Sequence, residues 1–488
     1  MPADVKGILD DVKLLKSMST QGHDLKIALS SRVVRTMADL VRPTYWANTG
    51  NNGKQLRRTA YLDGLRGFAA FMVYWLHHQL WAHDDVQMNN AFENVFGWNG
   101  RYYFAALPGI RIFFSGGHFA VTVFFVISGY VLSAKPLVLI HAGEFVKLGD
   151  NVGSAFFRRW LRLFLPVIGT TFVFMSVLHL SKVRTSIVDL APTYWEEVWI
   201  WYKEFNSFAF VFRSGGEPWF TYNFHAWSIP VEFRGSILIY TSVMAFSRCT
   251  RNARLLCQLG LISYFIWITD GWFCALFSSG MLLCDLDLLA ANGNLPQFFY
   301  ALRPYKRTIF HALFAVSIYL GGVPSRNADL DNLRNSYGWR YLSYLKPQAM
   351  WDYKWFFLIW ASTFLVSSVP HIPWLKAFFE THFCQYLGRI SFAFYLVHGP
   401  VLWLVGDRLY AAVGWPREWH ASNAPGWINR FPLPKGGPLG LEPSFLVLHF
   451  ILLPLTLWLA EIVTKVFDDP SIRLSQWLYK KMLPSSEK

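Results

Sequence analysis

Long apolar runs alternate with charged or Gly/Pro-rich segments along this chain. Runs of roughly membrane-spanning length lie near 64–82, 118–140, 161–180, 226–247, 255–271, 272–291, 308–322, 355–369, 387–406 and 444–467. A helix crosses a bilayer with about 20 apolar residues, and we expect aromatic flanks to extend the shorter runs. The pattern predicts an all-α polytopic membrane protein with about ten transmembrane helices. The interrupted run at 199–212 is predicted to be interfacial or re-entrant.

Basic residues gather at alternate ends of these runs. Counted from a cytosolic N-terminus, the groups that fall on one side are Lys54/Arg57/Arg58, Arg158/Arg159/Arg162, Arg248/Arg251/Arg254, Arg303/Lys306/Arg307 and Lys480/Lys481. The positive-inside rule then predicts that both termini are cytosolic. The loops at 83–117, 323–354 and 407–443 are expected on the opposite side.

The first 56 residues are mixed and charged, and they lack the apolar core of a secretory signal peptide. We therefore expect a cytosolic N-terminal extension at 1–56 and a membrane domain at 57–488. Within the extension, five apolar residues recur at helical spacing: Val33, Val34, Met37, Leu40 and Val41. This spacing predicts a short helix that packs against the membrane domain or lies on the membrane surface.

Composition agrees with this class. The 488 residues are 53% hydrophobic, 18% aromatic and only 16% charged, which is too apolar for an ordinary soluble protein. The net charge of +14 follows from the basic groups beside the apolar runs, so we expect no nucleic-acid partner. The five cysteines show neither CxxC spacing nor neighbouring histidines, and we predict no disulfide framework and no metal site.

The first apolar run carries polar groups at membrane depth. Arg66 and His77 are eleven residues apart, so on a helix they differ by about 20° in azimuth and about 16 Å along the axis. Charged and titratable groups on one membrane face indicate a central polar cavity among the helices. Alternatively, Arg66 snorkels to the interface or pairs with Asp63, and His77 is a structural histidine. His78 points about 100° away from this face.

Charged residues also lie at the start of the third apolar run and within the fourth. Arg158, Arg159 and Arg162 are expected at the cytosolic start of the third helix, where they either anchor the helix or bind a phosphate. Glu232 lies within the fourth apolar run and needs a partner, for which His77, His225 and Arg66 are candidates. Arg234 would face the opposite side of that helix.

Other polar residues within the runs have weaker assignments. Ser128 is predicted to permit close helix approach beside Gly129, and it would act as a nucleophile only with an activating base. His398 is either a packing residue or a participant in chemistry. Asp270, Asp285 and Asp287 are acidic groups at or near membrane depth, and we assign them no function.

Six segments in order resemble the acyltransferase 3 family of integral-membrane O-acyltransferases. They are LDGLRGFAAFMVYWLHH with its Arg-x10-His spacing, FFVISGYVLS at 124–133, FRRWLRLFLP at 157–166, HAWSIPVEF at 225–233, LGRISFAFYLVHGP at 387–400 and DDPSIRL at 468–474. In place of the family's Trp-Ser-Leu-x-x-Glu, this chain has Ile229 and an inserted Pro230, with the Glu spacing intact. DDPSIRL matches the family's C-terminal pattern only loosely.

The resemblance implies roles for particular residues. His77 would be the catalytic base, with Glu232 as a second catalytic residue that supports it. Arg66, Arg159 and Arg162 would bind the donor, because the arginine fork pairs with the phosphates of coenzyme A. Alternatively, Arg66 would support the base. Ser128, Trp227 and His398 are possible residues of a substrate cavity.

The implied activity is transfer of an acetyl or short acyl group from acyl-CoA to a hydroxyl. The acceptor would be a small lipophilic, secondary-metabolite or sugar-like molecule, and no cofactor beyond the co-substrate acyl-CoA is expected. The alternative is a multi-pass transporter whose intramembrane histidines and acids bind a solute or relay protons. A transporter of this kind often shows paired interrupted helices in two matching halves, which this sequence lacks.

Overall fold

The computed structural model describes residues 38–45, 56–84, 97–98, 101–212, 218–324 and 329–484. The chain divides into two compact units, Met1–Gly53 and Lys54–Lys488. In the first unit, residues 38–41 are helical, while Val33, Val34 and Met37 of the predicted short helix lie outside the described residues. The predicted boundary between residues 56 and 57 stays a prediction.

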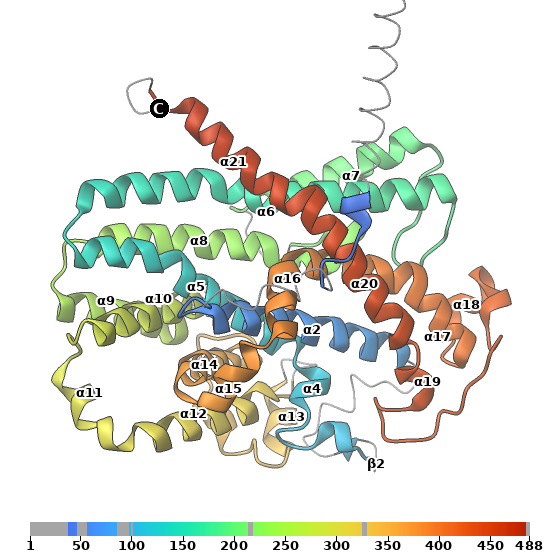
Figure 1. The fold of residues 1–488 in the computed structure, drawn as a ribbon. Coiled ribbons are helices and arrows are strands. Elements are labelled where there is room, and N and C mark those ends of the chain that lie inside the picture. The colour runs from blue at the N-terminus through green and yellow to red at the C-terminus, as the bar shows by residue number, and fades with distance from the viewer. Residues whose placement is uncertain are drawn as a thin grey trace, which may run out of the picture. The chain divides into compact units, whose positions relative to one another are not determined.

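Helices make up most of the described part of the second unit (Figure 1). The long ones are α2 (Ala60–Ala82), α5 (Gly117–His141), α6 (Phe145–Ser181), α7 (Tyr194–Ala209), α8 (Ser228–Ala245), α9 (Arg251–Ser263), α10 (Trp272–Ala291), α12 (Lys306–Gly321), α14 (Tyr353–Ser368), α16 (His382–Val401), α20 (His449–Val463) and α21 (Asp469–Met482). The short ones are α4 (Ile112–Ser115), α11 (Gln297–Ala301), α13 (Leu330–Asn335), α15 (Pro373–Phe379), α17 (Asp407–Val413), α18 (Glu418–Asn423) and α19 (Pro443–Leu446).

One small departure from an all-α fold occurs in the loop after α2. Strands β1 (Gly97–Trp98) and β2 (Arg101–Tyr102) pair antiparallel, with Gly97 opposite Tyr102 and Trp98 opposite Arg101. Pairs this short add little stability of their own. The helices therefore carry the fold.

Several helices are long and apolar enough to cross a membrane, which confirms a multi-pass membrane protein. Within the described ranges, five pass by length and composition: Gly117–His141, Phe145–Ser181, Trp272–Ala291, His382–Val413 and Pro443–Met482. A sixth results if Tyr353–His371 and Pro373–Phe379, bent by 100°, form one broken span. The prediction of about ten spans is thus not confirmed. The other predicted runs near 64–82, 226–247, 255–271 and 308–322 are helical, in α2, α8, α9 and α12.

The start of α6 corrects one sequence expectation, whereas the interfacial or re-entrant placement of the run at 199–212 stays a prediction. Helix α6 begins at Phe145, so Arg158, Arg159 and Arg162 lie more than three turns inside it rather than at its N-terminus. The dipole argument for an anion at that end does not apply to them, because the effect fades within the first turn. The run at 199–212 belongs largely to α7, whose start is fixed by a capping box between Thr193 and Glu196.

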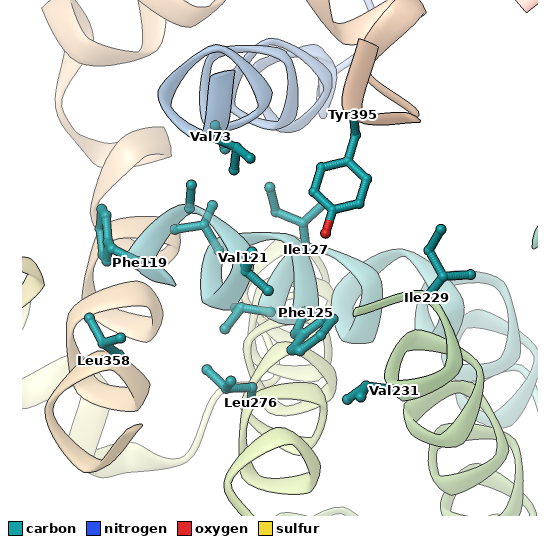
Figure 2. Close-up of a cluster of buried hydrophobic side chains, with 14 of the residues drawn as sticks. Val73, Phe119, Val121, Phe125, Ile127, Ile229, Val231, Leu276, Leu358 and Tyr395 are labelled. Carbon is teal, nitrogen blue, oxygen red and sulfur yellow. The ribbon is translucent and has the colours of Figure 1, made fainter. Parts of the chain in front are cut away.

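The apolar core surrounds α5. Figure 2 shows Phe119, Val121, Phe125 and Ile127 of α5 beside side chains from α2, α8, α10, α14 and α16. Glycines bring α5 and α10 unusually close: a Cβ at Gly129 would lie 2.0 Å from the Phe277 carbonyl oxygen, and one at Gly280 would lie 2.0 Å from that of Val126. The predicted close approach at Gly129 is confirmed.

Helices α2 and α16 run parallel and in contact. A Cβ at Gly67 would lie 2.2 Å from the backbone nitrogen of Gly388, and further along both helices the ring of Tyr74 stacks on that of Phe394. Only glycine fits at such a crossing, because no space remains for a side chain. This register decides which polar residues of the two helices meet.

Candidate active site

Three histidines converge at one end of the α2–α16 pair. His77 comes from α2, His398 from α16, and His225 from the 3₁₀ turn Thr221–Trp227 that precedes α8. The ring centroids lie 3.7 Å apart for His77 and His225, 4.7 Å for His225 and His398, and 5.3 Å for His77 and His398. One ring nitrogen from each lies within 4.8 Å of those from the other two. We refer to these three residues as the histidine cluster.

The members of the histidine cluster differ in exposure and bonding. His225 and His398 are 3% and 1% exposed, whereas His77 is half-buried. His398 Nδ1 lies 2.7 Å from the Tyr395 carbonyl oxygen, so that nitrogen carries the proton in the neutral ring. His398 Nε2 and His225 Nδ1 are buried without a hydrogen-bond partner among the described residues. Such orphaned nitrogens indicate a place for a polar ligand.

A polar cavity of about 270 Å³ lies at the other end of the same two helices. Its lining includes four arginines, from α2, α6 and α16, and three carboxylates, from α8 and the residues around the start of α21. These residues are Arg66, Arg159, Arg162, Arg389, Glu232, Asp468 and Asp469. Formally, four cations against three anions leave one positive charge. We call this space the arginine cavity, and its charge suits an anionic ligand.

Glu232 is held inside the arginine cavity by two partners. Ser128 Oγ donates to Glu232 Oε1 at 2.6 Å, and Arg159 Nη2 pairs with the same oxygen. The side chains of Arg159 and Glu232 are 11% and 15% exposed. The partner of Glu232 is therefore an arginine of α6. It is none of the three candidates that the sequence offered, His77, His225 and Arg66. Pro230 sits in the first turn of α8, where its missing N–H breaks no helical bond.

The other arginines of the cavity are less engaged. Arg66 donates to the Gly388 carbonyl at 2.9 Å and lies 3.5 Å from Asp63, which confirms the predicted pair. Arg162 and Arg389 have exposed side chains. Arg158 donates instead to Ser154 within its own helix and does not line the cavity. Arg162, Arg389 and Arg66 are thus better placed than Arg159 to meet an added anion.

Tyr395 connects the arginine cavity with the histidine cluster. Its side chain lines the cavity, its hydroxyl lies 2.8 Å from Ser228 Oγ and also donates to the His225 carbonyl, and its own carbonyl accepts from His398. Tyr395 thus contacts two members of the cluster. Tyr395 is therefore the residue that both lines the cavity and bonds to the cluster.

A family model described as an acyltransferase domain matches residues 59–460, which is most of the chain. This chain belongs to the acyltransferase 3 family. The matched span contains the histidine cluster and all of the arginine cavity except the residues around the start of α21.

Curated relatives extend the match over almost the whole chain. The O-acetyltransferase PaAT-1 of Phomopsis amygdali is 30% identical, covering 92% of this chain and 90% of the relative. The acyltransferase clz18 of Cochliobolus lunatus is 22% identical over 76% of this chain and 87% of the relative. The acyltransferase R4 of a Phoma species is 22% identical over 72% and 84%. No solved structure gives a significant match.

In this acyltransferase 3 protein, the predicted site residues fall into two groups. The arginine cavity brings together Arg66, Arg159, Arg162, Glu232 and Ser128, and the histidine cluster brings together His77 and His398. Trp227 lies outside both and packs near Trp272 and Trp355, with ring centroids 6.4 and 6.3 Å away. His78 points elsewhere, as predicted from its azimuth, and its Nδ1 lies 2.8 Å from the Tyr410 hydroxyl.

Sequence reasoning left out His225, Arg389 and Tyr395 as site residues. All three stand inside quoted motifs, HAWSIPVEF and LGRISFAFYLVHGP, so a signal was present. What was missing was the parallel register of α2 and α16, which no motif states. Of the acidic residues without an assignment, Asp285 pairs with Arg254, Asp287 accepts from Tyr130 and Asp270 accepts from the Trp351 N–H.

Proposed function

We propose that this protein is an acyl-CoA-dependent O-acyltransferase that places an acetyl or short acyl group on a hydroxyl of a small lipophilic, secondary-metabolite or sugar-like acceptor. The observation that carries the proposal is the pairing of a cationic cavity and a histidine cluster at two levels of the same helix pair. The relative PaAT-1, an O-acetyltransferase, supports acetyl as the group transferred.

The arginine cavity is the proposed donor site. Coenzyme A carries phosphates, and arginine pairs with phosphate through two parallel N–H donors. Arg162 and Arg389 line the cavity and have exposed side chains that can meet these groups. Arg159 instead fixes Glu232, so in this proposal the pair shapes the cavity wall.

The histidine cluster is the proposed site of chemistry. Because α2 is one continuous helix, His77 lies about 16 Å along the axis from Arg66. An extended pantetheine arm bridges a gap of this order and brings the thioester near the imidazole. Separate residues then hold the phosphates of coenzyme A and the reacting carbon of the thioester.

His77 acts as general base in the proposed reaction. Its ring nitrogen takes the proton of the acceptor hydroxyl while the oxygen attacks the thioester carbon. The tetrahedral intermediate collapses, the C–S bond breaks, and the thiolate of coenzyme A takes the proton back from the imidazolium. His398 lies beside this base, and the bond from its Nδ1 to the Tyr395 carbonyl fixes its ring. In this scheme His398 neither gains nor loses a proton.

The test uses purified full-length protein in detergent or nanodiscs, isotope-labelled acetyl-CoA and an extract of candidate acceptors. Mass spectrometry identifies the molecule that gains the labelled acetyl group. We expect label on a hydroxyl and release of one coenzyme A per transfer. Hydrolysis of acetyl-CoA without labelled product, or accumulation of an unmodified solute in sealed vesicles, would contradict the proposal.

A further inference from the structure

The histidine cluster has the composition of a transition-metal site. It offers three imidazole nitrogens within 4.8 Å of one another, and two of the three rings are almost fully buried. His225 Nδ1 and His398 Nε2 have no hydrogen-bond partner in the described part of the chain. Unpaired lone pairs of neutral imidazoles in a buried site are good ligands for Zn²⁺, Cu²⁺ and Ni²⁺.

We propose that His77, His225 and His398 bind one zinc-class divalent ion, and that this ion inhibits acyl transfer by occupying the His77 lone pair. The binding half of the proposal stands on the geometry alone. The inhibition half rests on the proposed function, in which His77 must accept a proton.

The tautomer of His398 favours coordination. Its Nδ1 is bonded to the Tyr395 carbonyl, so the neutral ring presents a bare Nε2. Metal-bound histidines almost always donate their second N–H to a carbonyl or carboxylate in this way, which fixes ring orientation and raises ligand basicity. The nearby His78 and His449 differ, because each places Nδ1 against a tyrosine hydroxyl at 2.8 Å.

The distances define how far the rings must move. Zinc sites hold imidazole nitrogens at about 2.0–2.1 Å, which in a tetrahedron places them about 3.4 Å apart. The cluster nitrogens therefore close by at most about 1.4 Å. The half-buried His77 ring, tilted by 32° against that of His225, is the least enclosed of the three rings.

The ligand set also defines which ions are excluded. Mg²⁺ and Ca²⁺ require oxygen ligands, and the cluster offers three nitrogens. The acidic Glu232 is engaged by Arg159 and Ser128. Three protein ligands leave the fourth tetrahedral position open for water or for the thiolate of coenzyme A.

The experiment uses the full-length protein with a purification tag that contains no histidine. Zn²⁺ is titrated by calorimetry, and Co²⁺ is used as a spectroscopic probe whose visible bands report tetrahedral coordination. We expect one ion per chain and no response to Mg²⁺. His225→Ala and His398→Ala should each weaken binding at least tenfold. The control His311→Ala removes a half-buried histidine of α12 outside the cluster and should leave binding unchanged.

Transfer of labelled acetyl groups is measured in the same titration. We expect Zn²⁺ to inhibit over the concentration range in which it binds, with chelator restoring turnover. If the variants do not fold, X-ray absorption of the zinc-loaded wild type counts the imidazoles, and fewer than three would overturn the site. Equal binding by wild type and both variants would also overturn it.

The two proposals fail separately. Zinc binding through three imidazoles without any acyl transfer supports the metal site and contradicts the proposed function. Stimulation of transfer by Zn²⁺, or full turnover at saturating Zn²⁺, overturns the inhibition.

Discussion

The imidazole centroids of His77 and His398 lie 5.3 Å apart at one level of two parallel helices, α2 and α16. Each helix also carries an arginine that lines the cavity at the other level, Arg66 on α2 and Arg389 on α16. The pair therefore presents two histidines at one end and two arginines at the other. Because each helix carries one histidine and one arginine, the same two helices build both the proposed donor site and the proposed site of chemistry.

Replacement of His77 separates chemistry from donor binding. We expect His77→Ala to lower kcat by about 100- to 10,000-fold, which is the usual contribution of a general base. Binding of coenzyme A, measured by calorimetry, and the melting temperature should stay near wild type, because His77 is half-buried. His78→Ala removes the contact with Tyr410, so it should lower the melting temperature. It should reduce kcat less than His77→Ala does. Near-normal turnover of His77→Ala would show that His77 is structural.

Arg162→Ala should weaken the use of acyl-CoA. Loss of a charge-assisted bond to phosphate costs on the order of 1.5 to 3 kcal/mol, so we expect the KM for acyl-CoA to rise about 10- to 150-fold. The KM for the acceptor should change little. The matched control is Arg158→Ala on the same helix, which lies outside the cavity. Equal donor responses in both variants would reduce Arg162 to a membrane anchor.

Arg159 and Glu232 should act as a unit. Removal of either partner leaves a largely buried charge unpaired, which we expect to cost about 3 kcal/mol or more and to lower the melting temperature. The double variant Arg159→Met/Glu232→Gln should be less damaged than the sum of the single variants, with a coupling energy of about 0.5 to 3 kcal/mol. Strict additivity would show that the pair contributes nothing specific.

The glycine crossing of α2 and α16 should be essential to the site. Gly67→Ala places a methyl group 2.2 Å from the Gly388 backbone nitrogen, so the helices must separate. We expect a loss of at least about 1 to 3 kcal/mol in stability together with reduced kcat, since His77 and His398 move apart. Gly153→Ala in α6 is the control, because its Cβ meets nothing within 4 Å. An unchanged melting temperature for Gly67→Ala would contradict this packing.

The predicted orientation has its own test. With both termini cytosolic, the loop at 407–443 lies on the opposite side of the membrane. We expect proteases added to sealed, cytosolic-side-out microsomes to cleave tags at the termini and to spare a site inserted near Gly426, whose Cβ would meet nothing within 4 Å. Cleavage near Gly426 in intact microsomes would contradict the orientation.

The sequence by itself determined the class of the protein and indicated most members of the candidate site. Apolar runs gave a helical multi-pass protein because a helix must cover its backbone polar groups within lipid. The eleven-residue spacing of Arg66 and His77 placed both on one face because helical geometry is local. The ordered motifs indicated the acyltransferase 3 family, which the family match then confirmed.

Only the tertiary structure decided which residues meet. Glu232 pairs with Arg159 rather than with His77, because α8 packs against α6 at that level. His225 joins the histidine cluster because a 3₁₀ turn before α8 directs it toward α16. These contacts depend on helix register, which glycines such as Gly67 and Gly388 set through close backbone approach. Periodicity along one helix carries no information about that register, because the contacts join residues on different helices, 73 positions apart for Arg159 and Glu232 and 322 for Arg66 and Gly388.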